Sequence, residues 1–197
     1  MALSGGKLAG GNPKGERQAE DFYATNPKAL EMLLEKYDLG EVHTMLEPCV
    51  GDGNLANFML NTRPFINIKA LDIVDRGFKG TLVQDFLKWE TEEKYDVVIT
   101  NPPFKLAREF VEKSLDLVTE EGKVIMFLKI QFLEGISRKE FLENSPLKYV
   151  YVFSSRMATW KEGKQTDEKG KPWSTTMCHA WFIWEKGYEG EPIIRWL

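Results

Sequence analysis

The chain has 197 residues, of which 43% are hydrophobic and 28% are charged, and this composition supports a packed core and excludes a wholly disordered chain. A net charge of -4 argues against a protein that coats nucleic acid nonspecifically, although a site for one nucleotide needs only a local basic rim. With two cysteines, Cys49 and Cys178, no disulfide framework is expected. No apolar run is long enough to span a bilayer, so we expect a soluble, cytoplasmic protein without membrane contacts.

The predicted elements start after residues 1–20, a polar, glycine-rich stretch that we expect to be a flexible arm. Residues 21–197 are expected to form a single domain. Asn26 and Pro27 predict the start of a helix, with Asn26 as the N-cap and Pro27 at the first helical position. An apolar stripe at helical spacing then continues to Tyr37.

Strands and helices alternate through the rest of the chain. Strands are predicted at 44–47, 67–72, 82–83, 95–100, 123–129, 147–153 and 175–184. Helices are predicted at 55–60, 106–118 and 137–142, the last one capped by Ser137. Alternation of this kind predicts a parallel sheet covered on both faces, and the last two strands, which no helix joins, predict a terminal antiparallel hairpin. The long polar loop between them, at 154–175, is expected to be either functional or disordered, as connections of this length usually are.

A turn suited to a nucleoside cofactor follows the strand at 44–47. Gly51, Gly53 and Ala56 fit the spacing G-x-G-x-x-A, in which glycines permit a tight turn and close approach of a ligand to the backbone. Asp72 ends the next strand and lies 19 residues after Gly53, where a carboxylate can bind the ribose hydroxyls.

Two further features bear on which cofactor is bound. Asp85 and Phe86 offer an acceptor for an exocyclic amine and a ring that could stack on a purine. Glu47, just before the turn, would repel a pyrophosphate and attract a cation. S-adenosylmethionine carries a sulfonium and an ammonium group, so Glu47 favours this cofactor over NAD.

A second motif, Asn101-Pro102-Pro103-Phe104, follows the strand at 95–100. Ligands of open parallel sheets bind at the carboxyl ends of the strands, so this motif and the glycine turn should face the same crevice. The prolines fix the backbone and leave carbonyl acceptors, Asn101 adds a side-chain carbonyl, and Phe104 adds a flat ring. The set suits a planar ligand with an amino group, and adenine is the obvious case.

In this order the motifs resemble those of the S-adenosylmethionine-dependent N6-adenine DNA methyltransferases, above all the small orphan enzymes of phages and prophages. The resemblance covers residues 21–130, including the stretch from Asp21 to Pro27, and the apolar strand near the end of the chain fits the family's last strand. It implies a Rossmann-like class I methyltransferase fold of the α/β class. The expected sheet is seven-stranded and mostly parallel, with a C-terminal antiparallel hairpin, and the expected location is the cytoplasm of a bacterial or phage-infected cell.

The resemblance also implies roles for individual residues. Asn101 and the Pro102 carbonyl would accept the two hydrogens of the target amine, and Phe104 would stack on the base. The implied catalytic residues are Asn101, Pro102, Pro103 and Phe104. The implied cofactor-binding residues are Tyr23, Thr25, Glu47, Pro48, Gly51, Gly53, Asp72, Ile73, Asp85, Phe86 and Asn101.

A DNA substrate would have to present its adenine flipped out or single-stranded. The candidates for contacts with the nucleic acid are Lys105, Arg108, Arg156, Lys161 and Lys164. Trp160 and Trp173, in the loop at 154–175, could stack on bases or wedge between them. We expect this loop to read a short or lax recognition sequence.

Other readings of the same residues remain open. The same chemistry could act on RNA, at adenine N6 or guanine N2, and some protein-glutamine methyltransferases carry a similar motif. A nucleotide-dependent oxidoreductase is disfavoured by Glu47, and a non-catalytic module by the intact Asn101. The two cysteines, with His43 and His179, match no zinc pattern, so no metal is expected.

Overall fold

The computed structural model of the chain describes residues 23–161, 163–166 and 168–197, and describes Lys161 by its backbone alone. The arm expected at residues 1–20 lies outside the described residues, as do Asp21 and Phe22. The strands are β1 (Tyr23–Ala24), β2 (Thr44–Glu47), β3 (Asn67–Asp72), β4 (Leu82–Val83), β5 (Tyr95–Thr100), β6 (Val118–Lys129), β7 (Leu147–Val152), β8 (Trp160–Lys161), β9 (His179–Glu185) and β10 (Ile193–Trp196). The helices are α2 (Pro27–Leu34), α3 (Asn54–Thr62), α4 (Ala107–Leu117) and α5 (Ile136–Asn144), with the short 3-10 helices η1 (Phe104–Leu106) and η2 (Ile130–Leu133).

Eight of these strands form one sheet in the order β10-β7-β9-β6-β5-β2-β3-β4. All neighbours are parallel except β9, which runs antiparallel to both β6 and β7. The predicted antiparallel hairpin is therefore confirmed as β7 and β9. The prediction of seven strands was wrong by one, because β10 follows the hairpin and pairs with β7 at the edge of the sheet.

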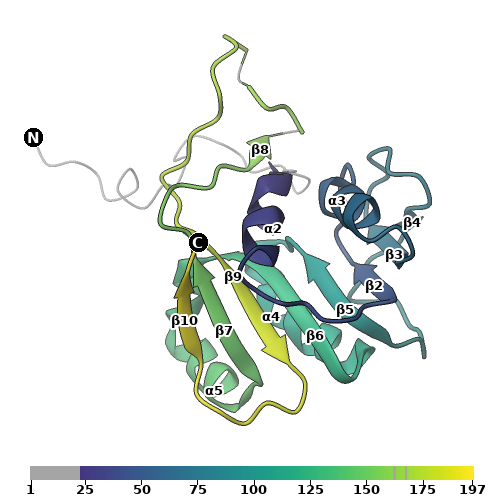
Figure 1. Cartoon of the computed structure of the whole chain (residues 1–197), viewed down its shortest axis with the longest axis vertical. Helices are drawn as coiled ribbons and strands as arrows, with labels where there is room; N and C mark the ends of the chain where they lie inside the picture. Colours follow the sequence, from purple (N-terminus) through teal and green to yellow (C-terminus); the bar gives the residue numbers. More distant parts are fainter. Residues whose placement is uncertain (1–22, 162, 167) are drawn as a thin grey trace, which may run out of the picture.

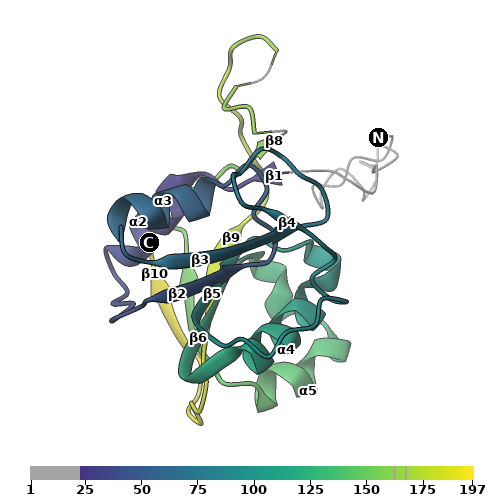
Figure 2. The ribbon, with the colours of Figure 1, turned by 90° about the vertical axis from the view of Figure 1, so that its right-hand side faces the viewer.

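Helices cover both faces of this sheet, with α2 and α3 on one side and α4 and α5 on the other (Figure 1 and Figure 2). Alternate strand residues feed the two cores, since side chains of a strand point to opposite faces. Met45 packs in the cluster that contains Leu30 of α2, whereas the adjacent Leu46 packs in the cluster that contains Val111 of α4, and all four are 0% exposed. The covered parallel sheet predicted from the sequence is confirmed.

The helix starts were predicted with mixed success. Asn26 caps α2 by accepting a hydrogen bond from the backbone N–H of Lys28, and Pro27 is the first helical residue, as expected. The cap predicted for α5 was wrong, because Gly135 holds the N-cap position and Ser137 lies inside the helix. The N-cap of α5 therefore lies two residues before the position predicted from the side chains.

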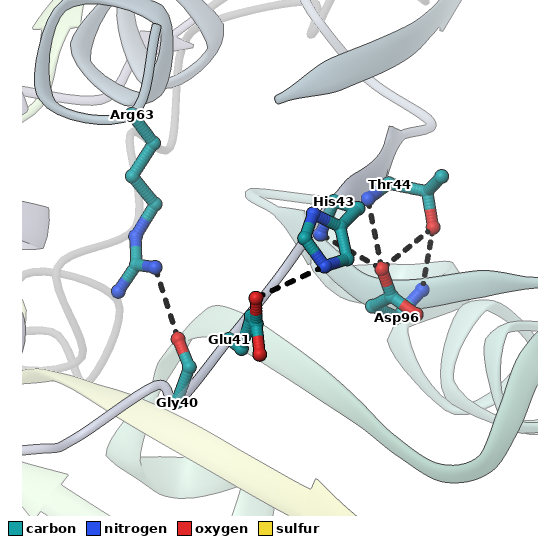
Figure 3. A network of polar contacts seen from close by, with 6 residues as sticks. All are labelled: Gly40, Glu41, His43, Thr44, Arg63 and Asp96. Carbon is teal, nitrogen blue, oxygen red and sulfur yellow. Dashed lines mark hydrogen bonds and ion pairs between the residues drawn. The ribbon is translucent and has the colours of Figure 1, made fainter. Parts of the chain in front are cut away.

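Polar contacts fix the start of β2 against β5 (Figure 3). Oδ2 of Asp96 accepts hydrogen bonds from the backbone N–H groups of His43 and Thr44, both at 2.9 Å. The Thr44 hydroxyl donates to the same oxygen at 3.0 Å and accepts from the Asp96 N–H at 3.0 Å. Burial acts to raise the pKa of Asp96, but these hydrogen bonds outweigh it and hold the pKa below its usual range. The contacts set the relative position of β2 and β5, whose other ends carry the site described next.

A separate pair of short strands lies beside the carboxyl edge of the sheet. β1 and β8 are antiparallel, with Tyr23 opposite Lys161 and Ala24 opposite Trp160. β8 belongs to the long segment between β7 and β9, which stands above the edge where the parallel strands end (Figure 1). Within the described residues, no helix combines the length and apolar character that crossing a membrane requires.

Candidate active site

The glycine-containing turn forms between β2 and α3, as predicted. β2 ends at Glu47, and α3 begins at Asn54 with Gly53 as its N-cap. Gly51 and Gly53 have φ angles of 55° and 84°, in the region that side chains disfavour. An added Cβ at Gly53 would also lie 2.1 Å from the Phe78 ring. Both backbone conformation and space therefore require glycine in this turn.

Asp72, the last residue of β3, is tied to the glycine turn. Its Oδ2 accepts a hydrogen bond from the backbone N–H of Gly51 at 2.9 Å, and its Oδ1 accepts one from Val74 at 3.1 Å. A carboxylate has about four lone-pair sites, so further acceptor capacity remains for a ligand. The adjacent Ile73 is 56% exposed and offers an apolar surface next to this carboxylate.

Glu47 is a buried carboxyl group at the end of β2, and Pro48 follows it in the turn. The residue is only 1% exposed, and its Oε2 has no hydrogen-bond partner among the described residues. Burial raises the pKa of Glu47 well above its ordinary value; a backbone hydrogen bond from Ala56 opposes this, and the charges of Asp52 and Asp72 add to it. A buried, unpartnered acceptor is costly, so this position suits a ligand that brings a cationic donor.

Asp85 and Phe86, which come shortly after β4, differ in their exposure and contacts. The side chain of Asp85 is 40% exposed, accepts a hydrogen bond from the Leu87 N–H at 3.0 Å and lies 3.3 Å from the Lys88 amine. Phe86 is 1% exposed, and its ring packs 4.9 Å from that of Phe110 in the core under α4. The stacking role predicted for the Phe86 ring therefore needs correction, because packing against α4 leaves it no face for a purine.

Asn101 and Tyr23, which are distant in the sequence, meet at the end of β5. The Nδ2 of Asn101 donates a hydrogen bond to the backbone carbonyl of Tyr23 at 3.2 Å. Thr25 is close by in the chain, 5% exposed, between β1 and α2. β2 and β5 are parallel neighbours, so the motif that starts at Asn101 and the turn that starts at Pro48 lie at the same edge of the sheet, as predicted.

Phe104 presents an accessible ring at this edge. It is 38% exposed, the Lys129 amine lies 4.8 Å from its ring centre, and the ring of His179 is 6.0 Å away. A cavity of about 130 Å³ opens beside it. The cavity is lined by Phe104, Ala107, Leu128, Lys129, Gln131, Phe132 and Arg138. Its volume is well below the range typical of drug-sized ligands, so it suits a single ring system.

His179 is a part of this region that the sequence analysis did not identify. It is 4% exposed, its ring stacks 4.8 Å from that of Phe127, and its Nδ1 hydrogen-bonds the Met157 carbonyl at 3.1 Å. Burial lowers the pKa of His179 to about 4; the Met157 carbonyl opposes this, and Lys129 and Arg156 reinforce it. The imidazole is therefore neutral near pH 7. His179 falls inside the strand predicted at 175–184, whereas β9 begins at this residue, so no local signal marked its position.

The basic residues beside the motif differ in what they can contact. Lys105 is exposed. Arg108 instead faces α5 and its own helix: its Nε lies 2.9 Å from a Glu112 carboxylate oxygen, its Nη1 donates to the Ser137 carbonyl at 3.2 Å, and its guanidinium lies over Phe141. Nη1 therefore links α4 to α5, while the side chain stays 46% exposed, so the contact of Arg108 with nucleic acid stays a prediction.

The remaining basic candidates belong to the long segment after β7. Arg156 is exposed and contacts the sulfur of Cys178, which joins the two ends of the segment. Lys164 is also exposed, and its backbone carbonyl accepts a hydrogen bond from the Trp173 indole at 2.7 Å. For Lys161, the described backbone shows the pairing with β1, and its side chain lies outside the description. The segment therefore has internal contacts near its two ends, between Arg156 and Cys178, and in its outer part, between Lys164 and Trp173.

No family model matches the chain. Part of it is similar to two Type II methyltransferases. It is 29% identical over 108 residues to M.AccI of Acinetobacter calcoaceticus, which is 48% of this chain and 20% of that protein. It is 28% identical over 99 residues to M.CvrRI of Paramecium bursaria Chlorella virus XZ-6E, which is 46% of this chain and 26% of that protein. The chain therefore aligns with about a quarter or less of the length of these relatives.

The chain is more similar to solved structures in its fold than in its sequence. The methyltransferase subunit of a type I restriction-modification system from Streptococcus thermophilus superposes with a TM-score of 0.63 at 15% identity, covering 88% of this chain and 47% of that one. An S-adenosylmethionine-dependent O-methyltransferase from Thermotoga maritima gives 0.60 at 14% identity, covering 88% and 70%. A protein from Listeria monocytogenes described as a class I S-adenosylmethionine-dependent methyltransferase gives 0.58 at 16%, covering 87% and 62%. The fold is that of the class I S-adenosylmethionine-dependent methyltransferases.

Proposed function

We propose that this chain is an S-adenosylmethionine-dependent methyltransferase that modifies the N6 amino group of adenine in DNA. One observation carries the proposal: the Asn101 nitrogen donates to the Tyr23 carbonyl, which leaves Oδ1 as an acceptor, and the ring of Phe104, three residues later, is exposed. The similarity to Type II methyltransferases supports the substrate class, and the fold supports the reaction class.

The residues around the glycine turn fit the proposed cofactor. Glu47 is buried with an unpartnered oxygen, which suits a cationic ligand and opposes a pyrophosphate. α3 starts at the turn without a side-chain cap, and the positive end of its helix dipole suits a carboxylate. Asp72 would bind the ribose, with Ile73 beside it. S-adenosylmethionine supplies an electrophilic methyl group on a positively charged sulfur.

Other predicted cofactor contacts would complete this pocket. Asp85, which is partly exposed, would bind the amine of the cofactor's adenine. Tyr23 and Thr25 would close the methionine side of the pocket. Phe86 is left out of this set because its ring belongs to the core.

At the target, the chain would act through acceptors and a stacking ring. The Asn101 Oδ1 and the Pro102 carbonyl would accept the two amine hydrogens, which raises electron density on a nitrogen whose lone pair is otherwise delocalised into the ring. Pro103 fixes the backbone, and Phe104 would stack on the base. His179 does not act as a base here, because its pKa of about 4 and its bond to the Met157 carbonyl make it a structural contact.

Nucleic-acid contacts must offset the cost of exposing the base. Unstacking costs a few kcal/mol, of which stacking on Phe104 could return about 1–3 kcal/mol. Contacts with phosphates would supply the rest, and the proposed residues are Lys105, Arg108, Arg156, Lys161 and Lys164. The segment at 154–175 would read the sequence around the base.

Nucleoside mass spectrometry tests the proposed function directly. The purified chain is incubated with S-adenosylmethionine and either unmethylated genomic DNA or total RNA, and each sample is digested and scanned for methylated nucleosides. We expect N6-methyldeoxyadenosine in the DNA sample alone. A methylated base in the RNA alone would move the substrate to RNA, and no product from either would contradict the proposal.

The Asn101→Ala variant is the matched control for this assay. Loss of one preorganised hydrogen-bonding group costs on the order of 100-fold in kcat, so product should fall by about that factor. Cofactor affinity, measured by calorimetry, should stay near that of the wild type because Glu47 and Asp72 are intact. Wild-type turnover in this variant would overturn the role of the motif.

A further inference from the structure

The amide of Asn101 is anchored by a single hydrogen bond to a two-residue strand. Its Nδ2 donates to the carbonyl of Tyr23, the first residue of β1, at 3.2 Å. An amide group carries donors on one end and an acceptor on the other, so an anchored nitrogen fixes where the oxygen points. If the amide turned over, Nδ2 would face the amino group of the target, and donor would meet donor.

β1 is held by the burial of Ala24, which is 2% exposed, and by pairing with the long segment after β7. Among the described residues, the strand partner of β1 is β8, with Tyr23 opposite Lys161 and Ala24 opposite Trp160. Strand pairs this short have little stability of their own. β8 is carried by a segment whose base is held by Met157, which is 8% exposed and accepts a hydrogen bond from His179.

We propose that the β1–β8 pair positions Asn101, so that the segment at 154–175 takes part in the methyl-transfer step as well as in binding nucleic acid. The proposal rests on the proposed function, in which the Asn101 Oδ1 accepts a hydrogen bond from the target amine. The chain of contacts is short: β8 holds β1, β1 presents the Tyr23 carbonyl, and this carbonyl orients the amide.

This arrangement couples substrate binding to catalysis. Nucleic acid that orders the segment around β8 also stabilises the pairing with β1, and with it the productive orientation of Asn101. A substrate that fails to engage the segment would meet a catalytic amide that is free to turn. Specificity would then be expressed in kcat as well as in affinity, as in other enzymes whose site is completed by the correct substrate.

The test compares two double variants at the same positions. Trp160→Pro with Lys161→Pro removes both backbone donors of β8, whereas Trp160→Ala with Lys161→Ala removes the same side chains and keeps both donors. The alanine pair therefore measures the loss of side-chain contacts with DNA, which should raise KM. At saturating DNA and cofactor, we expect the kcat of the proline pair to lie about fivefold to tenfold below that of the alanine pair, the size of one neutral hydrogen bond. Equal kcat values in the two pairs would overturn the proposal.

A second measurement detects the hydrogen bond between Asn101 and Tyr23 without relying on activity. In NMR spectra of selectively labelled protein, the side-chain amide protons of Asn101 should exchange slowly in the alanine pair and faster in the proline pair. Identical exchange would contradict the proposal even if activity differed. If the wild type transfers no methyl group, the proposed function fails, and this measurement still decides whether β8 holds the amide.

A double-mutant cycle distinguishes loss of the Asn101–Tyr23 hydrogen bond from a general disruption of the structure by proline. Asn101→Asp removes the donor to Tyr23, so it should cost less kcat in the proline pair, where the anchor is already lost, than in the alanine pair. If the two changes instead lower kcat by independent factors that multiply, β8 does not act through the hydrogen bond between Asn101 and Tyr23. Should the proline pair fail to fold, as judged by its melting curve, a glycine pair at the same positions weakens β8 and enters the same comparison.

Discussion

Glu47 combines burial, a raised pKa and an oxygen without a partner in the described residues. Burial therefore favours the neutral form of this carboxyl group more than it does for an exposed one. A cationic ligand reverses this preference, since it stabilises the ionised form. Cofactor binding and deprotonation of Glu47 should therefore be linked.

This linkage predicts a pH dependence of cofactor affinity. Because the pKa of free Glu47 is raised and binding requires the carboxylate, affinity should increase as the pH rises above the ordinary pKa of a carboxyl group. Calorimetry across this range measures it. Glu47→Gln is the control: it should bind S-adenosylmethionine about 1.5–3 kcal/mol more weakly at pH 7 and lose the pH dependence. An unaltered pH slope in Glu47→Gln would show that another group titrates.

At the scale of elements, the end of β2 opposite to Glu47 is held by Asp96 of β5 (Figure 3). Two backbone N–H groups, of His43 and Thr44, depend on one carboxylate oxygen. Parallel strands have no tight turn between them to fix their register, so side-chain contacts of this kind contribute to it. The register of β2 against β5 in turn places the glycine turn beside Asn101.

Asp96→Ala should destabilise the fold by about 2 kcal/mol at pH 7, since hydrogen bonds to a charged group are lost. The pKa of Asp96 is lowered in the folded state, so this contribution is present above the carboxyl's ordinary pKa and is lost as the pH falls through the folded-state value. Urea denaturation should therefore show a smaller difference between variant and wild type at pH 3 than at pH 7. Glu41→Ala, at an exposed partner of His43, is the control and should change stability by less than about 0.5 kcal/mol. A difference independent of pH would contradict this role of Asp96.

On the scale of the whole molecule, the candidate site draws on segments that are far apart in the chain. Tyr23 comes from β1, Glu47 from the end of β2, Asn101 from the end of β5 and His179 from the start of β9. The parallel sheet gathers the strand ends at one edge, and the segment at 154–175 stands above that edge (Figure 2). In the proposed function, this placement separates a cofactor side, built by the turn, from a nucleic-acid side, built by the segment.

That separation predicts a selective loss when the outer part of the segment is exchanged. Replacing residues 163–174 by a glycine-serine linker of equal length keeps β8 and Met157, so the melting temperature and cofactor affinity should stay near wild type. Affinity for DNA should fall and sequence preference should broaden, because the phosphate and base contacts proposed for Lys164 and Trp173 are removed. Sequencing of the methylated sites measures the preference, and an unchanged preference would place recognition elsewhere in the chain.

The sequence by itself determined those parts of the fold for which residues close together in the chain carry the signal. The bounds of β2, β3, β4 and β5 agree with the predicted ranges, because short apolar runs between turn residues are a local signal even where, as in β4, the run is exposed. The cap at Asn26 and the glycine turn also follow from local chemistry. The same holds for the pairing of the turn with the motif at Asn101, since strand ends of a parallel sheet meet at one edge.

Only the tertiary structure decided the features that depend on distant partners. β1 and β8 are too short to show a pattern, and β10 has an exposed edge position, so each exists through its pairing. The ring of Phe86 looked available in the sequence, but it packs in the core against Phe110, and Nη1 of Arg108 bonds the Ser137 carbonyl of α5. The hydrogen bond from Asn101 to Tyr23 spans 78 residues, a separation at which local spacing carries no information. Burial and long-range hydrogen bonding therefore decided which of the candidate side chains remain free to act.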